Sequence, residues 1–140
     1  MSTTIPRDRL PRYQADPEER GYCLRCGYAR RSHGIADACP NPAHGHPRAA
    51  DLAALAMSFP SLTRAWGAQP FNPYHLAAWG QAEASSGALH CVRFMLTVWS
   101  GQAHLEPFEV GPFDAVRALQ GWDNGNRAAF AAWARAPWWA

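Results

Sequence analysis

The chain has 140 residues, a formal net charge of +2 and no Lys, so all 13 of its fixed basic side chains are Arg. This length suits one compact domain with a small appendage, and the small net charge excludes a polycation that binds by charge alone. The lack of Lys fits codon bias in a GC-rich genome, such as that of a bacterium or its phage. It also fits a use of the planar guanidinium group for phosphate recognition.

Positive charge is concentrated in the first part of the chain. Residues 1–50 carry eight Arg against five acids, a net +3, whereas residues 51–140 carry five Arg against six acids, a net −1. The basic part also holds most of the Cys residues. Such an asymmetry favours a polyanionic partner for this part of the molecule.

No apolar run near the start resembles a secretory signal, and no stretch is long and apolar enough for a transmembrane helix. We therefore expect a cytoplasmic protein without membrane association. In a reducing compartment its four Cys residues should be thiols or metal ligands instead of disulfides.

Three segments are expected in chain order. Residues 1–20 hold three Pro, four Arg and four acids with little to bury, which predicts an extended or disordered arm. Residues 21–47 hold a cluster of Cys and His and predict a zinc-binding lobe. From residue 48 the apolar pattern changes to the period of an α-helix, which predicts a helical domain over 48–140.

The Cys and His cluster predicts one structural zinc ion. Cys23 and Cys26 form a C-x-x-C turn, followed by Gly27, which permits the positive φ that such turns often need. With His33 and Cys39 the pattern reads C-x2-C-x6-H-x5-C, and three thiolates and one imidazole complete the tetrahedron that zinc prefers. Nearby guanidinium groups favour the thiolate forms; they belong to Arg20, Arg25, Arg30 and Arg31.

The fourth ligand has alternatives. His44 would give C-x2-C-x12-C-x4-H, and His46 would give a third spacing. A further alternative is that the three Cys are free thiols. Three Cys and three His within 24 residues argue against it.

The pattern over residues 23–39 resembles a zinc knuckle, a short module that grips single-stranded nucleic acid. The resemblance implies ligand roles for Cys23, Cys26, His33 and Cys39. Knuckles place four residues on each side of the His, whereas this chain places six and five. The longer loops also resemble a generic zinc ribbon, and many ribbons bind protein or only stabilise a fold.

Aromatic and basic residues alternate around the first turn of the lobe. Bases stack on aromatic faces while Arg meets phosphates, so these residues could form a platform for a single strand. The alternative is that the Tyr rings pack the small zinc core and the Arg side chains are solvated. The residues are Tyr22, Arg25, Tyr28, Arg30 and Arg31.

The helical domain is expected to be a body of four or five helices. A stripe of Leu52, Leu55, Ala56 and Phe59 predicts a helix that Pro60 ends. Later helices are expected from Asn72-Pro73, from Ser85-Ser86 to Ser100, and over two segments near the end. The first of these has the stripe Phe113, Val116, Leu119 and Trp122, and the last begins at Asp123 or Asn124 and holds Phe130, Trp133 and Ala134.

Two features of this body have competing interpretations. Residues 94–99 could also form a buried strand, although the helical period is favoured. The Trp residues near the end could form an exposed surface for a partner or fold back to close the core, and the second is favoured. We expect Trp99 and Trp122 to be buried.

No residue set predicts catalysis. His44 and His46 could flank an open metal site, but no carboxylate lies close in sequence to act as a base. Cys91 lies in the most apolar helix beside His90, and a buried, unreactive thiol is favoured over a nucleophile. We therefore expect a non-catalytic zinc protein that contacts nucleic acid through its basic lobe. The alternative is a protein–protein adaptor or regulator that uses the aromatic body, with zinc purely structural.

Overall fold

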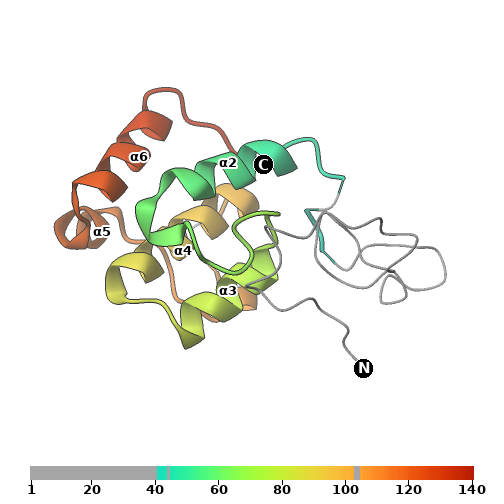
Figure 1. Cartoon of the computed structure of the whole chain (residues 1–140), viewed down its shortest axis with the longest axis horizontal. Coiled ribbons are helices and arrows are strands. Elements are labelled where there is room, and N and C mark those ends of the chain that lie inside the picture. The colour runs from blue at the N-terminus through green and yellow to red at the C-terminus, as the bar shows by residue number, and fades with distance from the viewer. Residues whose placement is uncertain (1–40, 44, 103–104) are drawn as a thin grey trace.

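The computed structural model describes residues 41–43, 45–102 and 105–140. The expected arm and the zinc ligands from Cys23 to Cys39 lie outside these residues. Within the described ranges the elements are five α-helices and two short 3-10 helices, and no strand is present there. The expected helical body is thus confirmed (Figure 1). The alternative strand over 94–99 is wrong, because these residues lie within one long helix.

The first three α-helices begin close to where the sequence predicts. Helix α2 spans Ala49–Ser58, and η3, Pro60–Leu62, follows directly. Helix α3 spans Pro73–Ala82, and the side chain of Asn72 accepts hydrogen bonds from the first-turn amides. Helix α4 spans Ser86–Ser100 and is capped by the Ser85 hydroxyl. Each cap satisfies amides that a helix cannot pair internally.

The remaining elements are shorter. The loop after α4 contains η4, Glu106–Phe108. Helix α5 spans Ala115–Gly121 and α6 spans Asn124–Ala134. Asp114 and Asp123 cap them, since each carboxylate accepts a hydrogen bond from an amide three residues later.

Helix α4 is the centre of the body. It packs against α2, α3, α5 and η3, so these elements surround it (Figure 1). Its buried side chains include Val92, Phe94 and Leu96. The Phe94 ring contacts the rings of Phe59, Phe113, Phe130 and Trp133, which come from the α2–η3 junction, the segment before α5, and α6. One aromatic cluster therefore joins segments that are far apart in the chain.

A tight turn before α3 depends on a glycine. Gly67 has φ of +92°, and its carbonyl accepts a hydrogen bond from the Asn72 amide. A Cβ on this residue would lie 2.4 Å from the Leu76 nitrogen and 2.6 Å from the Asn72 oxygen. Only glycine fits, both in conformation and in space. This turn precedes the buried Phe71, whose carbonyl accepts a hydrogen bond from Asn41 where the chain enters the body.

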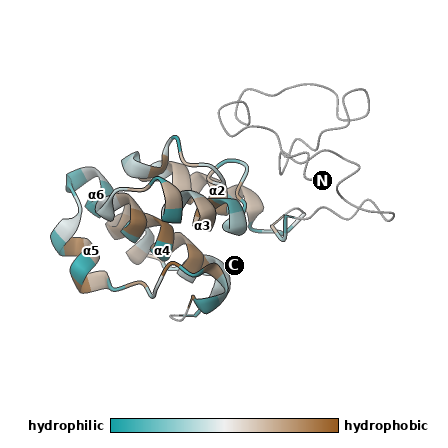
Figure 2. Cartoon of the chain, turned by 90° about the horizontal axis from the view of Figure 1, so that it is seen from below, coloured by the Kyte–Doolittle hydropathy of each residue, from teal (hydrophilic) through white to brown (hydrophobic). Residues whose placement is uncertain are grey.

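Of four side chains expected to face the core, one is buried and three are more exposed than expected. Trp122 is buried as expected, with 2% of its surface exposed. Trp99 is only half-buried, because it lies near the end of α4 next to the entering chain. Val116 and Leu119 are 66% and 40% exposed, although the stripe predicted that they face the core. Helix α5 is only seven residues long and lies at the rim of the body (Figure 2). Ala118 is its buried residue.

Candidate functional site

The predicted site residues lie outside the described part of the chain. They are the predicted zinc ligands, the fourth-ligand alternative His44 and the predicted nucleic-acid contacts. Among the described residues, no group of three or more His, Cys, Asp or Glu is arranged to hold a metal ion. The structure does show how the segment after Cys39 joins the helical body. The residues concerned are Cys23, Cys26, His33 and Cys39 for the metal, and Tyr22, Arg25, Tyr28, Arg30 and Arg31 for nucleic acid.

Asn41 attaches the entering chain to the body. Its side chain is 2% exposed, and its amide nitrogen donates to the Phe71 carbonyl at 2.8 Å. Its amide oxygen accepts from the Ala43 nitrogen at 3.0 Å, and Ala43 is itself buried. Sequence reasoning missed this residue, since an Asn between two prolines reads as an ordinary loop. Burial with both polar groups bonded indicates a fixed attachment point.

His46 is the fourth-ligand alternative that the structure describes. Its Nδ1 accepts a hydrogen bond from the Arg48 amide at 3.0 Å, at the start of α2. A neutral imidazole has one nitrogen lone pair to offer, so Nε2 carries the proton in this arrangement. The ring also makes an edge contact with Trp99, with centroids 5.3 Å apart. His46 would have to give up its hydrogen bond, or change tautomer, to bind zinc.

Arg48 joins the start of α2 to the C-terminal segment. Its guanidinium lies 4.6 Å from the centre of the Trp138 ring, a cation–π contact. Its Nη1 also donates to Asp51 Oδ2 at 3.0 Å, and both side chains are about half exposed. Screening by solvent makes this ion pair weak in free energy. The geometry nevertheless places the Arg48 cation on the Trp138 ring, at the residue directly before α2.

The C-terminal segment folds back on the body, as favoured from the sequence. The Trp133 Nε1 donates to the Trp138 carbonyl at 3.0 Å, and the Ala140 amide donates to the Val98 carbonyl at 3.0 Å. Trp133 and Trp138 are half-buried against the core. Trp139 contacts the edge of Trp133 but stays 49% exposed. The segment therefore closes the core and still presents one large ring to solvent.

Burial shifts the pKa values of three titratable groups on α3 and α4. Burial raises the pKa of the Cys91 thiol to about 12, so the thiolate is scarce at neutral pH. Burial lowers the pKa of His75 to about 4, and its ring stacks on Trp66 with centroids 3.8 Å apart. Burial, and next the charge of Arg93, lowers the pKa of His90. The expectation of a buried, unreactive Cys91 is consistent with this environment.

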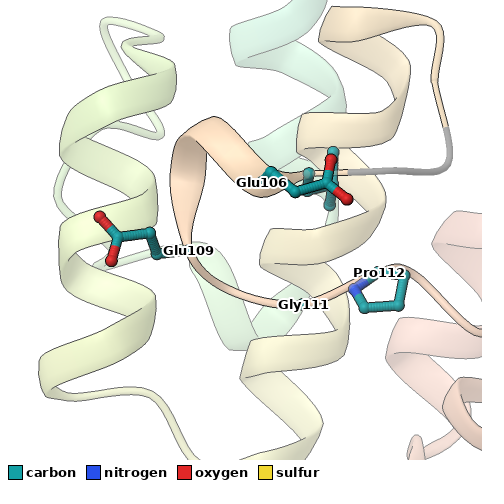
Figure 3. A pocket seen from close by; sticks show the side chains of 5 residues that line it. Glu106, Glu109, Gly111 and Pro112 are labelled. Carbon is teal, nitrogen blue, oxygen red and sulfur yellow. The ribbon is translucent and has the colours of Figure 1, made fainter.

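A cavity of about 380 Å³ lies over the loop after α4. Leu105, Glu106, Glu109, Gly111 and Pro112 line it, and the two carboxylates point in different directions (Figure 3). The loop is held from behind: Gln81 donates to the Phe108 carbonyl at 2.8 Å, and the Arg93 Nε donates to the Val110 carbonyl at 2.6 Å. Because its carboxylates diverge, the loop offers no paired acid and base.

Comparisons with known proteins give no family. No match to a protein-family model, to a curated protein or to a solved structure was found for this chain. Within the described residues, no helix is both long and apolar enough to cross a membrane.

Proposed function

We propose that this chain is a non-catalytic zinc-binding protein whose basic N-terminal lobe contacts single-stranded nucleic acid. The observation that carries the proposal is the pattern C-x2-C-x6-H-x5-C with Arg25, Arg30 and Arg31 inside it. Three thiolates and an imidazole fit zinc in number and chemistry. The Arg side chains neutralise phosphates, and Tyr22 and Tyr28 offer faces on which bases stack.

Features of the helical body support a contact with nucleic acid through the lobe. Its core is closed by the C-terminal segment, and its entering chain is fixed by Asn41. The net charge of residues 51–140 is −1, so the excess positive charge lies in the part that precedes the body. A body of this kind serves as a scaffold that carries the basic lobe.

Fluorescence anisotropy with labelled single-stranded and duplex DNA tests the proposal. Wild type should prefer the single strand, because stacking needs unpaired bases. Three Arg contacts on a single strand predict a log–log salt slope of about −2. The Arg25→Ala, Arg30→Ala, Arg31→Ala triple variant should bind much more weakly and with a flatter slope.

The matched control removes the same charge from the body. Arg64, Arg117 and Arg127 are exposed, and their triple Ala variant should keep wild-type affinity for the single strand. No binding by wild type at low salt, or equal loss in both triple variants, would contradict the proposal.

One observation favours a second candidate, a protein adaptor that uses the helical body. Val116 and Leu119 are exposed three residues apart on α5, which brings them to one face of that helix. Affinity capture with and without nuclease separates the two functions. Partners that persist after nuclease treatment and are lost in a Val116→Ser, Leu119→Ser variant would favour the adaptor.

A further inference from the structure

The C-terminal segment reaches the start of α2 (Figure 1), and there an exposed ring follows directly in the chain on a ring that contacts a cation. Trp139 is 49% exposed, whereas the neighbouring Trp138 is half-buried and carries the Arg48 guanidinium on its ring. Arg48 is the residue directly before α2 and follows the segment that Asn41 fixes to the body. We call Arg48, Trp138 and Trp139 the tail surface.

We propose that the tail surface is a second contact for the same single-stranded nucleic acid, with Trp139 stacking on a base and Arg48 facing a phosphate. This inference rests on the proposed function and extends it from the basic lobe to the helical body. Aromatic rings and Arg side chains together are the usual means of binding unpaired strands without sequence preference.

The tail surface is already held in place. The Ala140 amide donates to the Val98 carbonyl, and the Trp133 Nε1 donates to the Trp138 carbonyl, each at 3.0 Å. The two bonds flank Trp139 in the chain and limit its backbone freedom. A ring that is fixed before binding loses less conformational entropy when a base stacks on it.

The size of the exposed apolar surface favours a nucleic acid over a protein partner. A stable protein interface buries about 800 Å² on each side. The other large exposed apolar side chains of the described body are Tyr74 on α3 and Val116 and Leu119 on α5, which are different elements from the C-terminal segment. A base needs only one ring face and a nearby cation. The net charge of +3 over residues 1–50, which end at this surface, suits a polyanion.

Asp51 is bonded to the guanidinium that is proposed to face a phosphate. Its carboxylate accepts from Arg48 at 3.0 Å, so it competes with a phosphate for the same guanidinium. Asp51→Asn should therefore raise affinity for the single strand at low salt. Arg48→Ala should lower affinity and reduce the steepness of the log–log salt slope by about 0.7.

The test is anisotropy with a labelled mixed-sequence single-stranded DNA and full-length, zinc-loaded protein. Trp139→Leu should weaken binding roughly 5- to 100-fold, whereas Trp139→Phe, which keeps an aromatic face, should lose much less. Tyr74→Leu on α3 and Arg117→Ala on α5 are matched controls that should bind like wild type. Circular dichroism establishes that each variant is folded.

The outcomes separate the two proposals. If the Arg25, Arg30, Arg31 triple variant binds weakly but Trp139→Leu binds like wild type, the tail surface is refuted and the basic lobe stands. If the reverse holds, the lobe is refuted and the tail surface stands. If wild type does not bind the strand at low salt, both are wrong. Equal losses in Trp139→Leu and Tyr74→Leu would also overturn the tail surface.

Discussion

The side-chain amide of Asn41 donates to the main-chain oxygen of Phe71, 2.8 Å away, and so joins two points of the chain that are 30 residues apart. Asn41 comes two residues after Cys39, one of the predicted zinc ligands. Phe71 belongs to the turn that Gly67 makes possible, and its ring contacts Trp99 on α4. The folded body thus fixes the chain at a point two residues after Cys39 in the sequence.

Replacing Asn41 by Ala should destabilise the helical body by about 1–3 kcal/mol, because the buried Phe71 carbonyl and Ala43 amide both lose a partner. Urea denaturation followed by circular dichroism measures the change. Asn124→Ala is the control, because Asn124 is exposed on α6 and its loss should change stability by less than about 0.5 kcal/mol. Equal effects of the two substitutions would show that Asn41 is not an attachment point.

Gly67→Ala should cost more stability than Gly101→Ala. Both residues have positive φ, +92° and +71°, so each variant carries the conformational cost of about 1–2 kcal/mol. Only at Gly67 would the new Cβ meet backbone atoms within 3 Å; at Gly101 nothing lies within 4 Å. Overpacking adds roughly 1–3 kcal/mol. Thermal unfolding of both variants gives the difference directly, and equal melting temperatures would disprove the steric argument.

The helix starts could be predicted because their signals are local. Asn72 before Pro73, Ser85 before α4, and Asp123 before α6 each cap a helix through a side chain that bonds to nearby amides. The orientation of α5 could not be predicted in this way. Its three-residue spacing indicates a helical stripe, but which face is buried depends on how a seven-residue helix packs against α4. Long-range packing leaves the side chains of Val116 and Leu119 exposed.

The candidate zinc site stays a prediction that rests on chemistry alone. The spacing of Cys and His indicates a metal and its ligand types, because ligand number and softness are properties of the residues. The attachment of Asn41 and the contact between Arg48 and Trp138 depend on pairs of residues that are distant in the chain. No local pattern identifies such pairs.

Stability should fall as the pH drops from about 6.5 to 4, in part because of His75. Its pKa is about 4 in the folded protein against 6.5 for the free side chain. Between these values the unfolded chain binds more protons, so acidification favours unfolding, by at most about 3 kcal/mol for this group. In His75→Phe, which keeps a ring against Trp66, the pH dependence should be flatter over this range.

The slope of stability against pH, not the stability at one pH, is the readout for His75. Urea denaturation at a series of pH values gives the slope for both proteins, and NMR titration of the His75 ring gives its pKa in the folded state. His90→Gln is the comparison variant, because the pKa of His90 is lowered as well. It shows how much of the slope comes from this second imidazole. A normal His75 titration near 6.5 would contradict the argument.

Cys91 should resist alkylation in the native protein and react once the protein unfolds. The thiol is fully buried, and a pKa of about 12 leaves little thiolate at neutral pH. Iodoacetamide treatment followed by peptide mass spectrometry reports each Cys separately. The same treatment in denaturant, with a chelator present, is the control and should modify all four Cys. Rapid native modification of Cys91 would mean that α4 is exposed far more than the structure shows.

The last prediction concerns the metal: native mass spectrometry of protein purified without chelator should show one zinc per chain. Cys26→Ser and His33→Ala should lose it, because each removes a ligand from the predicted tetrahedron. His44→Ala should keep it. His46→Ala should also keep it, since the Nδ1 of His46 is already bonded to the Arg48 amide at 3.0 Å.

Each variant has a distinct meaning. Zinc retained in Cys26→Ser, or absent from wild type, would contradict the predicted zinc site. Loss in His44→Ala with retention in His33→Ala would move the fourth ligand to His44. Loss in His46→Ala would show that the imidazole leaves the Arg48 amide when zinc binds. In that case metal binding would break the hydrogen bond between the Arg48 amide and His46 at the start of α2. Zinc would then alter the stability of the helical body as well as that of the lobe.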